Sequence, residues 1–232
     1  MFLVVKNLNK SYGTNENKIS VLKDINFSLE KGVLCTLLGP SGSGKSTLLN
    51  AIGGLEKIDS GSIVINEYEI LSLKQNALSN FRRKYLGFIF QFYNLIPDLT
   101  VTENIQVGSF IHNDPIDIEK LIKDLGLWEH KNKYPRQLSG GQQQRCAIGR
   151  ALIKKPEILL CDEPTGALDY KTSKDILSLL QRINKEYETT IILATHNEEI
   201  TKMSNIIIRL KDGVICQEIE NYKIMDAQEL EW

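Results

Sequence analysis

Five short hydrophobic runs recur along the chain, nearly free of polar residues and rich in β-branched side chains. They cover residues 33–38, 88–90, 157–161, 190–194 and 206–210. Strands that are buried on both faces of a sheet have this continuous pattern rather than an alternating one. The runs therefore predict the strands of a sheet that is covered on both sides.

The stretches between these runs have helical periodicity. Leu48, Ile52 and Leu55 are spaced i, i+4, i+7, which places them on one face of a helix. The hydrophobic face of a second helix, between the third and fourth runs, consists of Ile176, Leu180, Ile183 and Tyr187. Alternation of strand, helix and strand predicts an α/β domain whose core sheet is mostly parallel.

The N-terminal region departs from this pattern. Residues 2–30 predict strands with turns, and "YGTNENK" at 12–18 predicts a hairpin loop. The segment 61–70 can pair with these strands as an antiparallel β patch. At the other end of the sequence, residues 223–232 predict a short helix of no evident role.

A second departure is the mainly helical pattern of residues 92–150, with its clearest amphipathic stretch at 116–127. We interpret this region as a helical subdomain inserted into the α/β core. The core then consists of residues 1–91 and 151–232, and the chain is expected to be a single domain over residues 1–232.

Composition excludes several classes of protein. Hydrophobic residues make up 42% and charged residues 25%, as in an ordinary soluble domain. The 28 Lys and Arg against 29 Asp and Glu leave a net charge of −1, which argues against nucleic acid as a partner. No run approaches the roughly 18 apolar residues of a membrane span, and "MFLVV" lacks a basic leader and a cleavage site. We therefore expect a cytoplasmic location.

Cysteine usage agrees with that location. Cys35, Cys146, Cys161 and Cys216 lie far apart, and three of them are in hydrophobic segments. This spacing indicates neither a disulfide framework nor a zinc site, so we expect the cysteines to be buried structural residues.

The segment "GPSGSGKST" at 39–47 lies between a predicted strand and the helix that contains Leu48. Its G-x-x-x-x-G-K-[ST] pattern in this context predicts a phosphate-binding loop. Glycines allow backbone N–H groups to converge on phosphate oxygens, where the helix dipole adds positive charge. The predicted nucleotide-binding residues are Gly39, Pro40, Ser41, Gly42, Ser43, Gly44, Lys45, Ser46 and Thr47.

Within this loop Lys45 is expected to contact the β- and γ-phosphates, and Ser46 to bind Mg²⁺. Two adjacent carboxylates, Asp162 and Glu163, follow the buried run at 157–161. Ligands of parallel sheets bind beyond the carboxyl ends of the strands, so both carboxylates are expected near the same phosphates. Asp162 suits Mg²⁺, and Glu163 is then free to polarise an attacking water.

Three further polar residues lie at or near the ends of hydrophobic runs. Gln91 follows "FIF", His196 follows "TIILAT", and Asp169 lies in "GALD". Because these positions share one rim of the predicted sheet, we expect them to sense the γ-phosphate.

A second glycine-flanked helix start occurs in "LSGGQQQR". Ser139 is a predicted N-cap, and Gln142 follows it at the spacing of a capping box. Gly140 and Gly141 let backbone N–H groups approach an anion closely. The chain therefore contains two helix starts suited to phosphate.

These motifs together resemble the ATP-binding subunits of ABC transporters, over about residues 2–220. The matching pieces are, in order, Tyr12, "GPSGSGKST", Gln91, "LSGGQQQR", "ILLCDEP", "ALD" and His196. The resemblance implies a P-loop NTPase core with a mostly parallel sheet, an antiparallel β patch and an inserted helical lobe. It also implies ATP and Mg²⁺ as cofactors, with Tyr12 stacking on adenine.

The resemblance implies that two subunits pack head to tail, each ATP lying between one phosphate loop and the partner's "LSGGQ" signature. Ser139, Gly140, Gly141 and Gln142 would then act in trans. Asp169 would lie at the dimer interface. Glu163, His196 and Gln91 would form the catalytic group, with Gln91 also near the metal. The partner would be a second copy of the chain or a homologous ATPase.

A membrane permease is the other implied partner, and it would place the chain on the inner face of the membrane. We expect the contact within residues 90–105, which include Phe92, Tyr93, Leu95 and Ile96; these side chains can equally fill the lobe's core. The segments "FRRKYLGFIFQ" and "DEPTGALD" are similar to the macrolide-export, lipoprotein-release and bacitracin-type group, which pairs with four-helix permeases bearing external domains.

Two other functions stay open at this point. An amino-acid importer ATPase is the first, although such proteins usually have Ser where Gly166 stands. A soluble DNA-repair ATPase is more remote, because the chain lacks heptads and a basic face. The sequence also departs from the group at residues 106–115, at Cys161 and at Asn197. Gly149 stands where Ala is usual, which lowers helix propensity by up to about 1 kcal/mol.

Overall fold

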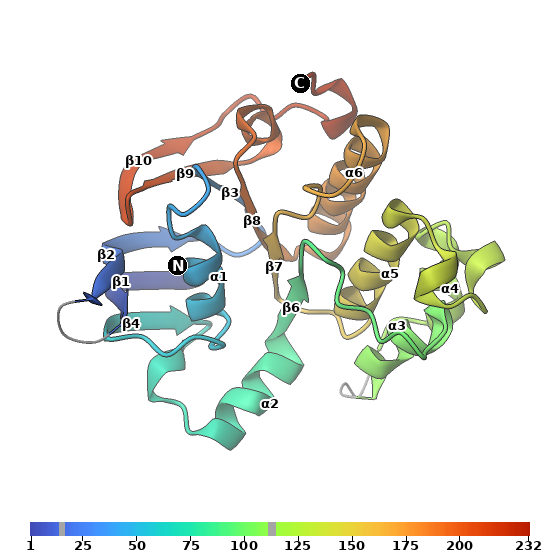
Figure 1. Cartoon of the computed structure of the whole chain (residues 1–232), viewed down its shortest axis with the longest axis horizontal. Helices are drawn as coiled ribbons and strands as arrows, with labels where there is room; N and C mark the ends of the chain where they lie inside the picture. Colours follow the sequence, from blue (N-terminus) through green and yellow to red (C-terminus); the bar gives the residue numbers. More distant parts are fainter. Residues whose placement is uncertain (14–16, 111–114) are drawn as a thin grey trace.

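The computed structural model describes residues 1–13, 17–110 and 115–232. Part of the predicted hairpin loop at 12–18 and part of the unusual segment 106–115 lie outside the described residues. The rest forms two sheets with helices packed around them (Figure 1).

The larger sheet has six strands in the order β10-β9-β3-β8-β7-β6. Its strands are β3 (Leu34–Leu38), β6 (Leu86–Ile89), β7 (Ile158–Asp162), β8 (Thr190–Thr195), β9 (Ile206–Lys211) and β10 (Val214–Glu220). The first five correspond to the five hydrophobic runs and pair in parallel, which confirms the predicted core sheet. β10 pairs antiparallel with β9 and was not expected from the pattern.

The smaller sheet is antiparallel, with its strands in the order β2-β1-β4-β5. It contains β1 (Leu3–Tyr12), β2 (Ile19–Leu29), β4 (Ser60–Ile65) and β5 (Tyr68–Glu69). The predicted β patch is therefore confirmed.

Three helices pack around the core sheet: α1 (Lys45–Ile52), α2 (Gln75–Tyr85) and α6 (Tyr170–Tyr187). The expectation that Leu55 belongs to the first of them is wrong. α1 ends at Ile52, because the chain turns at Gly53 and at Gly54, which has a φ of +62°. Leu55 lies beyond this turn and is half exposed.

Residues 92–110 and 115–150 form mainly helical structure on one side of the core sheet (Figure 1). The α-helices are α3 (Val101–Ser109), α4 (Ile118–Asp124) and α5 (Gly140–Leu152). Two 3₁₀ turns, η3 (Trp128–His130) and η4 (Pro135–Gln137), connect α4 to α5. The predicted helical subdomain stays our interpretation of this region, and α5 continues to Leu152, past the expected boundary.

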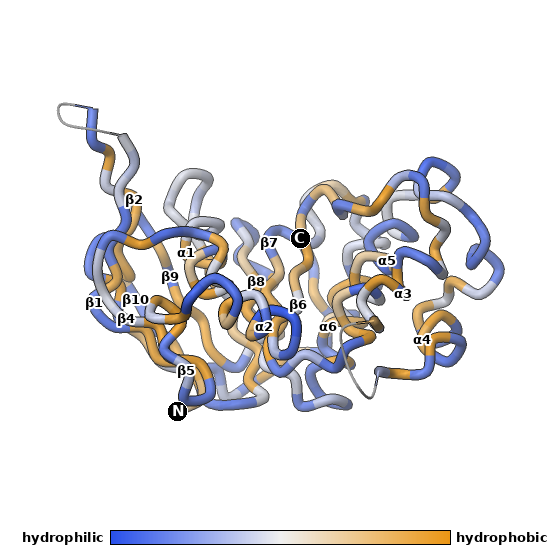
Figure 2. Tube along the Cα trace, turned by 90° about the horizontal axis from the view of Figure 1, so that it is seen from below, coloured by the Kyte–Doolittle hydropathy of each residue, from blue (hydrophilic) through white to orange (hydrophobic). Residues whose placement is uncertain are grey.

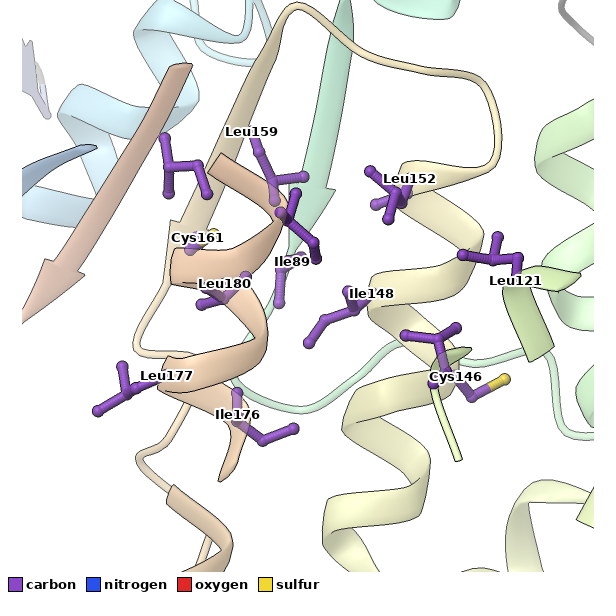
Figure 3. Close-up of a cluster of buried hydrophobic side chains, with 14 of the residues drawn as sticks. Ile89, Leu121, Cys146, Ile148, Leu152, Leu159, Cys161, Ile176, Leu177 and Leu180 are labelled. Carbon is purple, nitrogen blue, oxygen red and sulfur yellow. The ribbon is translucent and has the colours of Figure 1, made fainter. Parts of the chain in front are cut away.

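Two hydrophobic clusters lie on the two sides of the core sheet. One joins α1 and α2 to the antiparallel sheet. The other joins the helical lobe to α6, and Figure 3 shows Ile148 of α5 facing Ile176 and Leu180 of α6, with Cys161 of β7 beside them. In Figure 2 the hydrophobic colour follows the strands, while many connecting loops are hydrophilic. The second cluster shows that the helical lobe shares a hydrophobic core with the six-stranded sheet.

Close approach of α3 to α5 depends on glycine. A Cβ on Gly108 would lie 2.4 Å from the carbonyl oxygen of Arg150, a backbone atom of α5. Gly149 on α5 is packed in the same way, since its Cβ would lie 2.6 Å from Leu125 and 2.9 Å from Ile105. Gly149 therefore provides space for two buried side chains, which offsets its low helix propensity.

We expect Gly108→Ala to lower the free energy of unfolding by about 1–3 kcal/mol, the usual range for overpacking. Alanine favours an isolated helix, so intrinsic propensity alone predicts the opposite sign. Urea unfolding of this variant measures the difference, with the exposed Gln106→Ala on the same helix as control. Unchanged or increased stability of Gly108→Ala would show that α3 and α5 are not in this close contact.

Two smaller expectations need correction. Residues 223–232 contain a single 3₁₀ turn, η6 (Ala227–Glu229), in place of a helix. Cys35, Cys146 and Cys161 are buried as expected, but Cys216 on β10 is exposed, and all four are free thiols. Among the residues that the structure describes, no helix is long and apolar enough to cross a membrane.

Candidate nucleotide site

The phosphate loop connects β3 to α1. Gly44 has a φ of +104°, a left-handed conformation that glycine adopts without steric cost, and α1 begins at the next residue. Lys45 is only 5% exposed, and its ammonium group donates to the carbonyl oxygens of Gly39 at 2.8 Å and Pro40 at 3.0 Å. Lys45 is thus held against the phosphate loop, where it is expected to contact the β- and γ-phosphates.

Two features of this loop suit an anionic ligand. Several successive backbone N–H groups lie at the start of α1, where the helix dipole favours negative charge. In addition, the hydroxyl of Ser43 is buried, and it has no hydrogen-bond partner among the described residues. A buried polar atom without a partner is costly, and a phosphate oxygen is one group that could satisfy it.

Ser46 and Asp162 form the part of the site that can hold a metal. Ser46 Oγ donates to Asp162 Oδ1 at 3.0 Å. The pKa of the Asp162 carboxyl is raised, chiefly by burial, while the hydrogen bond from Ser46 acts in the opposite direction. A nearby cation would favour the charged carboxylate. Hydroxyl and carboxylate oxygens are ligands that Mg²⁺ prefers, so these residues fit that ion.

Glu163 lies at the centre of the charged groups. Its Oε1 is 3.7 Å from the ammonium group of Lys45 and 3.3 Å from Nδ1 of His196. Its φ of +45° is unusual for a residue other than glycine, and its backbone N–H donates to the carbonyl oxygen of Ala194 at 3.0 Å. Such conformations persist where the surrounding structure holds them, often at functional sites.

Lys45, Ser46, Asp162 and Glu163 line one pocket of about 490 Å³. The lining residues come from β1, β2, the phosphate loop, α1 and the ends of β6 and β7; they are Tyr12, Val21, Ser41, Gly42, Gly44, Lys45, Ser46, Thr47, Gln91, Asp162 and Glu163. Val21 is the one that sequence reasoning missed, because nothing in its local pattern separates it from other strand residues.

Five predicted site residues of the single chain do not line this pocket: Gly39, Pro40, Ser43, Asp169 and His196. His196 contacts the lining residue Glu163, with Nδ1 3.3 Å from Oε1. Asp169 is the N-cap of α6, accepting hydrogen bonds from the backbone and hydroxyl of Thr172. Those bonds lower the pKa of the Asp169 carboxyl. In the single chain, Asp169 therefore caps the N-terminus of α6.

The second glycine-flanked helix start has the predicted capping box. Ser139 Oγ accepts from the backbone of Gln142, and the Gln142 side chain accepts from the Ser139 backbone at 2.9 Å. Ser139 itself is exposed. A Cβ on Gly140 or Gly141 would crowd Tyr93 or Thr172. None of residues 139–142 is among those lining the phosphate pocket.

Comparison with known proteins decides the family. The family model described as "ABC transporter" matches residues 22–166. The chain belongs to the ABC transporter family. It is therefore an ATP-binding, ATP-hydrolysing subunit, which implies a membrane permease as partner.

Two relatives indicate the range of ABC proteins that it resembles. The bacitracin export ATP-binding protein BceA of Halalkalibacterium halodurans is 43% identical over 222 residues, covering 94% of this chain and 88% of that protein. The macrolide export ATP-binding/permease protein MacB of Aggregatibacter actinomycetemcomitans is 41% identical over 228 residues, covering 96% of this chain and 35% of that protein. The chain thus spans about a third of MacB.

Solved structures agree with the fold. The dimeric structure of a post-hydrolysis state of the ATP-binding cassette MJ0796, bound to ADP and Pi, has a TM-score of 0.86 and 39% identity, covering 94% of this chain and 98% of that one. A second dimeric structure of MJ0796, a bacterial ABC transporter cassette, has the same TM-score and identity. The predicted α/β cassette fold is confirmed.

Proposed function

We propose that this ABC ATPase works as a head-to-tail pair, in which each ATP is bound by the phosphate loop of one chain and the signature of the other. The observation that carries this proposal is the separation of the two phosphate-suited helix starts. Lys45, at the start of α1, lines the phosphate pocket together with Glu163. Ser139, at the start of α5, is exposed and does not line that pocket.

In this arrangement Ser139, Gly140 and Gly141 contact the γ-phosphate held mainly by the partner chain, and Gln142 maintains the helix start through its capping bond. Asp169 lies at the interface between the chains. A chain alone then has two half-sites and hydrolyses ATP poorly. The dimeric MJ0796 structures, at 39% identity, support pairing as the working state.

Within each site we assign roles from the contacts. Tyr12 is exposed at the end of β1 and lines the pocket, where its ring can stack on adenine. Lys45 neutralises charge on the β- and γ-phosphates. Glu163 accepts a proton from the attacking water, and His196, 3.3 Å from its carboxylate, keeps that carboxylate in position.

We assign the metal site to Ser46, Asp162 and Gln91. Mg²⁺ bound there would neutralise charge that develops on the phosphoryl oxygens. Among the described residues no group of three or more His, Cys, Asp and Glu side chains could hold a metal ion. That is consistent with Mg²⁺ taking most of its ligands from nucleotide and water, as it commonly does.

Export, or transmission of force to a permease, is the activity that we propose for the whole transporter. BceA and MacB are named for bacitracin and macrolide export, and both match nearly all of this chain. The partner would be a four-helix permease with an external domain, which holds the chain at the inner face of the membrane. Phe92, which follows Gln91 directly in the sequence, and Ile96, four residues further on, are exposed, so they are suited to contact the permease.

The test of pairing is the dependence of ATP turnover on protein concentration. Because a complete site needs two chains, turnover per chain should rise with concentration and then level off. Size-exclusion chromatography with ATP present should show the dimer forming over the same range of protein concentration in which turnover per chain rises. Turnover per chain that is constant from fully monomeric to fully dimeric samples would contradict the proposal.

A further inference from the structure

Residues 221–232, here called the C-terminal strap, run along α6 (Figure 1). Gln181 of α6 is only 5% exposed, and it uses both ends of its amide on the strap. Its Nε2 donates to the carbonyl oxygen of Met225 at 2.9 Å, and its Oε1 accepts from the backbone of Ala227 at 3.1 Å. Ala227 and Leu230 are fully buried. The strap is therefore an integral part of the fold.

The strap also contacts the segment that follows His196. Asn221 Nδ2 donates to the carbonyl oxygens of Lys202 and Ser204, at 3.1 and 3.0 Å. The backbone of Met225 donates to Lys202 O at 3.0 Å. Lys202 belongs to the 3₁₀ helix η5 (Glu198–Met203), which begins two residues after His196. The strap thus joins α6 to the segment that carries His196.

The strap ends on the first residue of α6. Tyr170 donates its hydroxyl hydrogen bond to Leu230 O at 3.1 Å. The Tyr170 ring meets the Trp232 ring edge-on, with centroids 5.0 Å apart. Tyr170 and Trp232 both line a second pocket of about 280 Å³, which also includes Glu163 and His196. Glu163 therefore lies between the nucleotide pocket and a pocket walled by Trp232.

The loop from Glu163 to Asp169 is held at its two ends and, between them, by a 2.8 Å hydrogen bond that the buried Gln144 Nε2 donates to Pro164 O. Near Glu163 it is held by the bond from Glu163 N to Ala194 O, and a bond from Gly166 N to Glu163 O closes its first turn at 3.0 Å. Its other end leads directly into Tyr170. Because a left-handed Glu163 persists only where its surroundings hold it, loosening Tyr170 should alter the placement of the Glu163 carboxylate.

We propose that Trp232 is a positioning residue for ATP hydrolysis: its contact with Tyr170 holds the far end of the loop that carries Glu163 and so keeps that carboxylate aligned with His196. The proposal rests on the proposed role of Glu163 in hydrolysis. Trp232 does not line the nucleotide pocket, so its removal should affect turnover and leave ATP affinity nearly unchanged.

The test compares three variants of the full chain under dimer-forming conditions. Trp232→Ala should lower kcat about 3- to 30-fold with KM for ATP changed less than about twofold, since sub-ångström misplacement of a reacting group acts on kcat. Trp232→Phe keeps an aromatic ring against Tyr170 and should restore most of kcat. Tyr222→Ala removes a 90% exposed aromatic side chain of the same strap and should match wild type.

Wild-type kcat for Trp232→Ala, an equal change in KM, or loss of kcat in Trp232→Phe as large as in Trp232→Ala would overturn the proposal. If Trp232→Ala does not fold, Trp232→Leu serves instead, because it keeps a bulky hydrophobic side chain but removes the ring that meets Tyr170 edge-on. It should lower kcat at constant KM, and wild-type kcat in that variant overturns the proposal.

A nucleotide-free measurement separates this proposal from the proposed function. The sequence has two tryptophans, so Trp128→Phe leaves Trp232 as the only tryptophan emitter. Adding Tyr170→Ala should shift the Trp232 emission to longer wavelength as the indole loses its packing. Unchanged emission would overturn the contact itself, whereas wild-type turnover in Glu163→Gln would overturn the proposed role of Glu163.

Discussion

Replacing Glu163 by glutamine is expected to lower ATP turnover by about 10²- to 10³-fold, within the usual contribution of a general base. Glutamine has nearly the shape of glutamate but cannot accept the proton of the attacking water. Nucleotide binding should survive, because Lys45 and the phosphate loop are unchanged. In the proposed cycle hydrolysis lets the pair separate, so the stalled variant should accumulate as an ATP-bound dimer.

Phosphate release measures the turnover of Glu163→Gln, and size-exclusion chromatography with and without ATP measures its assembly. Glu186→Gln is the matched control, since Glu186 is exposed on α6 and outside both pockets. Turnover of Glu163→Gln within a factor of about three of wild type would remove Glu163 from the general-base role. A variant that binds ATP yet stays monomeric would contradict ATP-driven pairing.

Lys45→Ala is the second change with a large expected effect. The buried ammonium group, 2.8 and 3.0 Å from two loop carbonyl oxygens, is placed to neutralise phosphate charge. Its loss should reduce ATP affinity and turnover together, with kcat/KM falling about 10²- to 10³-fold, as for other groups that stabilise developing charge. Titration with a fluorescent ATP analogue and steady-state kinetics measure the two quantities.

A matched lysine is available for that experiment. Lys185 is exposed on α6, so Lys185→Ala changes the net charge equally without touching the pocket. Thermal melts of both variants show whether folding is retained. Wild-type affinity in a folded Lys45→Ala would mean that the pocket at the start of α1 is not where the phosphates bind.

Much of this site could be predicted because the motifs encode backbone geometry locally. The phosphate loop needs glycine at a left-handed position, which Gly44 occupies, and a strand and helix on either side. The continuous hydrophobic runs predicted the strands of the core sheet. Because these strands pair in parallel, their carboxyl ends lie at one edge of the sheet. Asp162, Glu163 and Gln91 accordingly line the same pocket.

The remaining features depend on contacts between distant segments. β10 is exposed except at the half-buried Ile215 and Ile219, so no hydrophobic run marks it. From the sequence, the effect of Gly149 could be predicted only from its low helix propensity. Its close contacts with Ile105 and Leu125 become apparent only in the folded chain. The strap was expected to have no evident role, because its partners on α6, Tyr170 and Gln181, are more than forty residues away in sequence.

The central claim is that the signature of one chain completes the phosphate site of the other, and mixing two inactive variants tests it. Ser139→Asp keeps a good N-cap but places a carboxylate where the partner's γ-phosphate would bind. Ser139→Asn is its neutral control and should keep most activity. Lys45→Ala, in contrast, has a defective phosphate loop and an intact signature.

Mixing Ser139→Asp with Lys45→Ala should form pairs in which the phosphate loop of the first chain faces the signature of the second. One of the two sites in each mixed pair is then intact, so turnover should recover to about a quarter of wild type when chains pair at random in such a two-site assembly. If the mixture is no more active than the two variants measured separately, although sizing shows mixed pairs, the signature does not act in trans.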